Sequence, residues 1–209
     1  MKQVILTVFA VIALGLVSKA QFRVGVKAGG NLSNQQISVP SGSLYTGKDV
    51  AGYHVGVLSE FMIARNVYLQ PQLLFTRKGA SLFQSTEKGM AKLRINYLEL
   101  PVTVLYKVQL PFGKIFGGAG AAFSYAISGS QSQDGNTTNI FSGTQHWQRE
   151  DISLCFTAGM EFNNGIFISM NSEKGLMNVY QTDGITAKNK SRSVTVGYTI
   201  DWNKLKGKG

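Results

Sequence analysis

Charged residues of opposite sign recur on the polar side of segments whose other side is apolar, and the chemistry this favours is ion pairing. The candidates are Arg23, Lys27, Glu60, Lys78, Glu99, Lys107, Glu161, Glu173 and Asp201, with His54 and Asp151 at matching positions. A buried charge without a partner is strongly destabilising, so acids and bases gathered on one enclosed face are expected to pair. The spacing therefore predicts a polar network inside the fold.

Catalysis by the same residue types is a weaker hypothesis. His146 lies near Asp134, Asp151 and several serines, which would allow a nucleophilic triad if the fold brought them together. The chain has only 2 histidines, and loops of this composition hold such residues by chance. The other histidine, His54, lies on the same face of its segment as Glu60 but ~20 Å away along an extended strand. We expect no catalytic residues and no enzymatic activity.

Metal, cofactor and nucleic-acid binding also lack a sequence signal. There is no cluster of Cys and His residues, and the glycine-rich "GGAGAA" from Gly117 lacks the third glycine and the following helix of a phosphate-binding loop. The formal charge of +10 comes from Lys and Arg scattered along the chain. We expect no metal, no cofactor and no nucleic-acid partner, and interpret the basic charge as partly interior and partly directed at anionic lipid surfaces.

The first residues have the pattern of a secretory signal. Lys2 precedes an apolar run from Val4 to Val17, and "SKA" offers small residues for cleavage after Ala20. The run is shorter than the ~20 apolar residues that a membrane-spanning helix needs. We predict a signal peptide over 1–20 and one domain over 21–209 that ends in a short basic tail, "KLKGKG". Cys155 is the single cysteine, so no intramolecular disulfide is expected.

Strict alternation of apolar and polar residues predicts strands. In "SVTVGYTIDW", Val194, Val196, Tyr198, Ile200 and Trp202 fall on one side and small or polar residues on the other. Side chains of a strand alternate between its two faces, so this is one apolar and one polar face. Similar segments are 22–32, 52–63, 67–79, 95–108, 113–127, 150–162, 165–173 and 193–202. The fourth, fifth and seventh alternate less cleanly, which indicates either a plugged interior near one rim or a slip in register.

The connections between these segments alternate between long polar loops and tight turns such as Asn163-Asn164-Gly165. This pattern is typical of outer-membrane barrels and places both termini at the short-turn end. The fold class predicted is all-β, an eight-stranded antiparallel up-and-down transmembrane β-barrel.

The apolar side is predicted to face lipid. Charged residues make up 15% of the chain, against about 25% in an ordinary soluble domain. The polar side is rich in Gly, Ser and Thr, which suits a narrow interior. Aromatic residues near segment ends are expected to form interfacial girdles: Phe22, Tyr53, Phe61, Tyr125, Phe162 and Trp202. A secreted lipocalin-type barrel would need the opposite facing.

Three motifs resemble successive signatures of a β-barrel family of the Bacteroidetes outer membrane, often labelled porin-like or PorT-like. They are "GVKAGGNLS" from Gly25, "LQPQLLFTRKGA" from Leu69 and "NYLELPVTVLYK" from Asn96. The resemblance implies an eight-stranded barrel, mostly without assigned activity, with one branch that assembles a secretion system. The chain departs from the family at Gln72 and Phe75, where Glu and Tyr are common, and it continues past Trp202.

The expected function is a small outer-membrane barrel with a structural or interaction role, a lumen plugged by ion pairs and long extracellular loops. The alternatives are a narrow porin for small solutes and a secretion-system-associated barrel. Expected partners are outer-membrane lipid, the barrel-assembly machinery and an envelope protein. The expected location is the outer membrane of a Gram-negative, Bacteroidetes-like bacterium, with periplasmic termini.

Overall fold

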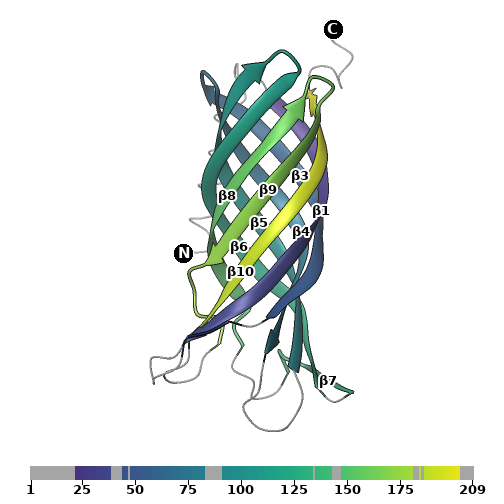
Figure 1. The fold of residues 1–209 in the computed structure, drawn as a ribbon, viewed down its shortest axis with the longest axis vertical. Helices are drawn as coiled ribbons and strands as arrows, with labels where there is room; N and C mark the ends of the chain where they lie inside the picture. Colours follow the sequence, from purple (N-terminus) through teal and green to yellow (C-terminus); the bar gives the residue numbers. More distant parts are fainter. Residues whose placement is uncertain are drawn as a thin grey trace.

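The computed structural model describes residues 22–38, 44–46, 48–82, 91–133, 135–142, 147–180, 184 and 186–202, and within them the chain is almost entirely strand (Figure 1). The signal peptide predicted over 1–20 and the basic tail lie outside the described residues. The strands are β1 (Phe22–Ser38), β2 (Leu44–Thr46), β3 (Lys48–Ala64), β4 (Val67–Leu82), β5 (Ala91–Leu110), β6 (Gly113–Gln133), β7 (Asn136–Asn139), β8 (Glu150–Phe162), β9 (Ile166–Gly175) and β10 (Thr186–Asp201).

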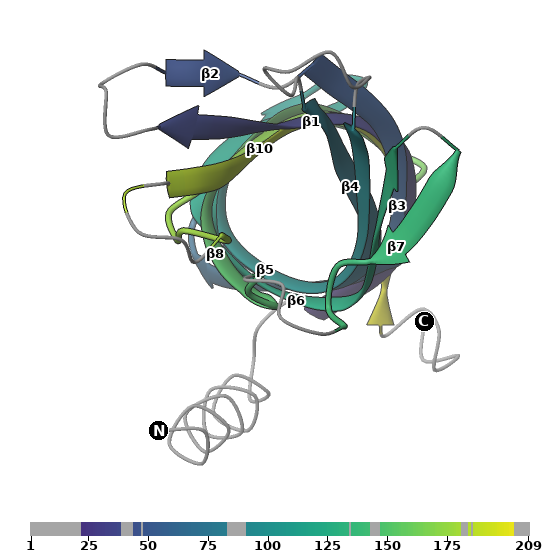
Figure 2. The ribbon, with the colours of Figure 1, turned by 90° about the horizontal axis from the view of Figure 1, so that it is seen from below.

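Eight of these strands form a closed antiparallel ring in the order β1, β3, β4, β5, β6, β8, β9, β10. The ring closes where β1 pairs with β10, from Arg23 opposite Asp201 to Ser38 opposite Thr186. Figure 2 shows the ring along its axis, with β2 and β7 lying outside it. Each ring strand pairs with its neighbours in chain order, so the predicted eight-stranded antiparallel up-and-down fold is confirmed.

The two ends of the ring differ in their connections. At one end, the short-turn end, the strands are joined at Arg65–Asn66, at Pro111–Phe112 and through Asn163 to Gly165. Asn66 (φ 65°) and Gly165 (φ 90°) adopt the left-handed backbone that tight turns require. The connections at the other end, the long-loop end, have more residues, and β2 and β7 lie there (Figures 1 and 2). Phe22 of β1 stacks on Phe61 and meets Trp202 edge-on, so the described chain begins and ends at the short-turn end.

The apolar side of the strands faces outward. On β10, Val194 is 53% exposed and Val196 52%, whereas Thr195 between them is fully buried. The same pattern holds around the ring, where the interior holds buried Lys, Glu, Gln, Thr and Ser and the exterior holds exposed Val, Leu, Ile, Phe and Tyr. The predicted outward orientation of the apolar side is confirmed. Among the described residues, no helix is both long and apolar enough to cross a membrane.

Several strands extend beyond the lengths predicted from alternation. The first connection was expected to begin after Leu32, but β1 continues to Ser38 through pairing with β10 and with β2. β6 likewise continues to Gln133 and pairs with β7. These extensions are mostly polar on both sides, even though Ser33 and Gln35 of β1 are buried, and a segment without an apolar side carries no period-two hydropathy signal.

The fourth predicted segment keeps one parity along its length, because its odd-numbered residues from Ile95 to Lys107 are all buried. The β5–β6 register shifts between Asn96 and Tyr97, so one β6 residue is left over in the pairing. The interior side of β5 also turns apolar toward the long-loop end, where Leu93, Ile95 and Tyr97 are buried. The imperfect alternation of this segment therefore comes from apolar residues on the interior side, such as Tyr97 and Leu105. The register shift changes the parity of β6 instead, where the buried residues pass from Ala126 to Gly129.

Candidate functional site

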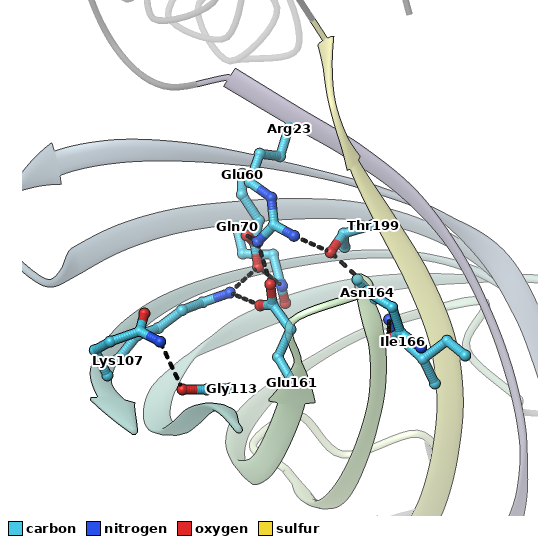
Figure 3. Close-up of polar contacts among 11 residues, drawn as sticks. Arg23, Glu60, Gln70, Lys107, Gly113, Glu161, Asn164, Ile166 and Thr199 are labelled. Carbon is cyan, nitrogen blue, oxygen red and sulfur yellow. Dashed lines mark hydrogen bonds and ion pairs between the residues drawn. The ribbon is translucent and has the colours of Figure 1, made fainter. Parts of the chain in front are cut away.

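The polar lumen is the candidate site, and its short-turn end holds a four-residue ion-pair ring, the short-turn cluster (Figure 3). One guanidinium nitrogen of Arg23 lies 3.2 Å from Glu60 Oε2 and 2.6 Å from Glu161 Oε1. Lys107 Nζ lies 2.6 Å from Glu60 Oε1 and 2.7 Å from Glu161 Oε2. Each cation therefore bridges both carboxylates. The residues come from β1, β3, β5 and β8. β1 and β3 pair with each other, with Arg23 opposite Glu60, whereas β5 and β8 pair neither with them nor with each other, so the ring links separate parts of the wall.

Neutral side chains complete this cluster. Gln70 Nε2 donates to Glu60 Oε1 at 2.8 Å, and the other guanidinium nitrogen of Arg23 donates to Thr199 Oγ1 at 2.6 Å. The Lys107 ammonium also lies 5.1 Å from the centre of the Tyr68 ring, within the range of a cation–π contact. The cluster holds equal numbers of cations and carboxylates and is almost fully buried. These contacts satisfy the condition under which buried ion pairs are tolerated.

A second group, the central cluster, forms around Lys78 of β4. Its Nζ lies 2.5 Å from Glu99 Oε1 on β5 and 2.5 Å from Glu173 Oε2 on β9. Thr76 Oγ1 and Ser124 Oγ donate to Glu99 at 2.6 and 3.1 Å. β4 and β9 lie on opposite sides of the ring order, so the Lys78–Glu173 pair spans the lumen.

Lys27 and His54 are buried in the lumen and have neutral partners. Lys27 is 8% exposed and its Nζ donates to Gln72 Oε1 at 2.8 Å. Gln72 in turn donates to Gln70 of the short-turn cluster. His54 shares a 2.9 Å hydrogen bond with Thr195 Oγ1 and none with Glu60, in agreement with the separation expected along the strand.

A small cavity lies in the lumen beside these side chains. A cavity of about 30 Å³ is lined by Lys27, Asn31, His54, Lys78 and Glu99, among others. A water molecule needs about 10–15 Å³ on this measure, so the cavity has room for one or two waters. The side-chain amide of Asn31, which has no hydrogen-bond partner among the described residues, lines it.

Apolar packing occupies the long-loop end of the interior. Ile140, which follows β7, is fully buried against Leu93, Ile95, Tyr97 and Ala126. Phe141 and Trp147 pack on this group, and Trp147 meets Tyr180 edge-on at 5.1 Å between ring centres. The segment between β6 and β8 therefore folds back onto the interior faces of β5 and β6.

The remaining sequence candidates are placed as follows. Asp151 is buried on β8, and its Oδ2 accepts a hydrogen bond from Asn189 at 2.8 Å. Asp201 lies opposite Arg23 in the β1–β10 register and is half-buried. His146 and Asp134 of the suggested triad lie outside the described residues. Within the described ranges, no group of His, Cys, Asp and Glu could hold a metal ion.

Sequence reasoning missed the neutral partners of the ionic groups, above all Gln70, Gln72 and Thr76. All three have the same parity as Lys78 on the third predicted strand. That parity was the signal that could have placed them in the interior. The apolar packing by Ile140 and Trp147 had no comparable signal, because both lie in a connection where alternation does not apply.

A closed antiparallel ring with an apolar exterior and a charged, hydrogen-bonded interior has the architecture of a transmembrane β-barrel. The family comparison gives the same class. Residues 18–181 match the model of the outer membrane protein beta-barrel domain, and the chain belongs to that family and to the outer membrane.

Solved structures similar to this chain are outer-membrane barrels of low sequence identity. The attachment invasion locus protein Ail of Yersinia pestis is 14% identical, with a TM-score of 0.44 and 86% of this chain and 99% of that chain covered. Neisserial surface protein A is 12% identical, with a TM-score of 0.44 and coverage of 87% and 99%. The outer membrane protease OmpT of Escherichia coli is 9% identical, with a TM-score of 0.43 and coverage of 89% and 98%. No curated protein sequence matches the chain.

Proposed function

We propose that this protein is a non-conducting, non-catalytic barrel of the outer membrane with a structural or interaction role. Its long-loop end lies outside the cell, where the loops meet an envelope protein or an external partner. Its termini lie in the periplasm, as expected for a chain that arrives there through a signal peptide and is inserted by the barrel-assembly machinery. The motif resemblance supports placing it in the porin-like, PorT-like group of Bacteroidetes barrels.

The observation that carries this proposal is the bridging of both Glu60 and Glu161 by each of Arg23 and Lys107. An ion or solute that passes the short-turn end would have to break at least one of these ion pairs, whose four residues are anchored on four different strands. Separating a buried cation from its carboxylates leaves an uncompensated charge, which costs about 3–5 kcal/mol. The central cluster and the apolar packing of Ile140 add two further obstacles along the same path.

The test is conductance across a planar lipid bilayer. Folding is first established from a band that shifts on boiling in a denaturing gel, because a closed barrel resists the detergent until it is heated. The folded wild-type protein is expected to give no single-channel steps. The double variant Glu60→Ala with Lys107→Ala, which removes two members of the ring, is expected to give small steps or bursts.

A wild-type protein that conducts in regular steps would contradict the plugged lumen and establish the narrow porin instead. The water-sized cavity beside Lys27 is the observation that favours that alternative, since it is already polar and lies in the middle of the lumen. The variant Glu150→Gln, in an exposed position on β8, is the matched control and is expected to stay silent.

A further inference from the structure

The outer surface of the barrel has a sharp boundary between apolar and polar residues near the long-loop end. On β10 the outward residues change from Val194 to Arg192, and on β4 from Phe75 to Arg77. On β9, Met170 is 70% exposed, and the next residues on the same outer face toward the long-loop end are Ser172 and Lys174. This boundary marks where the lipid-facing band ends on each of these strands.

Basic residues gather just beyond this boundary. The outward set, the basic rim, consists of Arg77, Lys92, Arg94, Lys174, Lys190 and Arg192. Among the described residues, none of the six lies within ion-pair distance of a carboxylate. The outward carboxylates nearby are Asp49, which accepts a hydrogen bond from Asn34, and Glu150. At the short-turn boundary, Arg65 is the only outward cation among the residues that the structure describes.

The rim has one half on β9 and β10. Lys190 and Lys174 are direct cross-strand partners, and Arg192 is the next outward residue on β10. Like charges directly opposite each other on one face of a sheet repel and destabilise the pair. An anion seated between them would remove that repulsion, whereas the chain itself offers no carboxylate there among the described residues.

The other half of the rim lies on β4 and β5. Arg77 pairs with Asn96, and Arg94 is the next outward residue on β5, opposite Gly79. Lys92 follows on the same face. Gly79 has no side chain that could cover the Arg94 guanidinium. The guanidinium groups of Arg77 and Arg94 are therefore both free to bind one anion. Arginine binds phosphate with two parallel hydrogen bonds, so two adjacent arginines suit a phosphate group.

We propose that the basic rim binds the phosphate groups of lipid head groups in the leaflet at the long-loop end, with one seat on β9–β10 and another on β4–β5. Both seats lie at head-group level, directly beyond the apolar band and facing away from the lumen. Lipid is the occupant because the side chains point into the membrane boundary and the adjoining surface is built for acyl chains. The inference rests on the proposed orientation, in which this end faces the outer leaflet.

The experiment uses native mass spectrometry of the folded protein in an uncharged maltoside detergent. The probes are lipid A, a phosphorylated acylated glucosamine disaccharide, and digalactosyl diacylglycerol, an uncharged glycolipid. Wild-type protein is expected to retain lipid A selectively. The variant Lys174→Gln/Lys190→Gln/Arg192→Gln is expected to bind it about 10- to 100-fold more weakly at one seat. Arg77→Gln/Lys92→Gln/Arg94→Gln is expected to lose the other seat, and Arg65→Gln is the control at the opposite boundary.

Equal retention of both lipids by wild-type protein, or unchanged binding by both triple variants, would overturn the inference. Displacement of lipid A by millimolar inorganic phosphate would also overturn it, because the site would then be a general anion site. Each sample is checked for the heat-dependent gel shift and for conductance. A barrel that conducts but still selects lipid A would refute the plugged lumen and leave this inference standing. A barrel that does not conduct and does not select lipid A would refute this inference and leave the plugged lumen standing.

Discussion

Arg23 on β1 and Glu161 on β8 form a 2.6 Å ion pair across the lumen, although their strands are not neighbours in the sheet. Backbone hydrogen bonds hold each strand only to the two beside it. Side-chain pairs of this kind add links between distant parts of the wall. The lumenal network therefore links strands that the backbone hydrogen bonds leave unconnected.

Loss of the Glu60 charge should destabilise the barrel strongly. Glu60→Gln leaves Arg23 and Lys107 sharing the single carboxylate of Glu161, so one buried positive charge becomes uncompensated. The expected loss in the free energy of unfolding is about 3–5 kcal/mol. Urea titration of protein folded in lipid vesicles, followed by the gel shift, measures it. Glu150→Gln should change the midpoint very little, and equal effects of the two substitutions would refute the role of the short-turn cluster.

The central cluster should behave as one coupled unit. Lys78→Met leaves Glu99 and Glu173 facing each other without their cation and should be severely destabilising. Adding Glu173→Gln removes one of the repelling charges, so the double variant should be more stable than the sum of the single effects predicts, by about 0.5–3 kcal/mol. The control double variant combines Lys78→Met with Glu161→Gln. These two residues share no ion-pair partner, so their effects on the free energy of unfolding should add. Additivity in both double variants would contradict the coupling.

A positive charge on the outer surface should cost more in the middle of the apolar band than at its edge. Val57 is 51% exposed on the outer face of β3, and Ala51 is exposed on the same face near the long-loop end. Val57→Arg should destabilise the folded barrel by about 2–4 kcal/mol, and Ala51→Arg by about 0–1 kcal/mol. Urea unfolding in vesicles measures both. Equal costs at the two depths would mean that this face does not lie in lipid.

The glycines of "GGAGAA" should matter for strand packing. A Cβ at Gly120 would overlap the carbonyl oxygen of Val102, and one at Gly118 that of Val104. Gly117 faces outward, and a Cβ there would meet only Thr157 O at 3.9 Å. Gly120→Ala and Gly118→Ala should each destabilise by about 1–3 kcal/mol, while Gly117→Ala should stay within about 0.5 kcal/mol. A uniform response along the motif would argue against backbone crowding as the reason for the glycines.

Parity along each strand was enough to predict the interior set of charges, because a strand that faces lipid on one side repeats with period two. Thr195 between Val194 and Val196 shows how directly that rule acts. The rule failed for the extensions of β1 and β6, which are mostly polar on both faces. It also gave no warning of the interior packing by Ile140, which lies in a connection and takes its place from the fold around it.

The sequence by itself determined the strands, the turns at one end, the outward apolar side and the inward position of Arg23, Lys107, Glu60 and Glu161. Only the tertiary structure decided their pairing. Arg23 lies opposite Asp201 in the β1–β10 register and opposite Glu60 in the β1–β3 register, yet its guanidinium also reaches Glu161 on β8, a strand that does not pair with β1. In a closed barrel the strands tilt and stagger around the axis, so residues far apart in register reach the same level of the lumen. That stagger is a property of the whole ring, and no single strand encodes it.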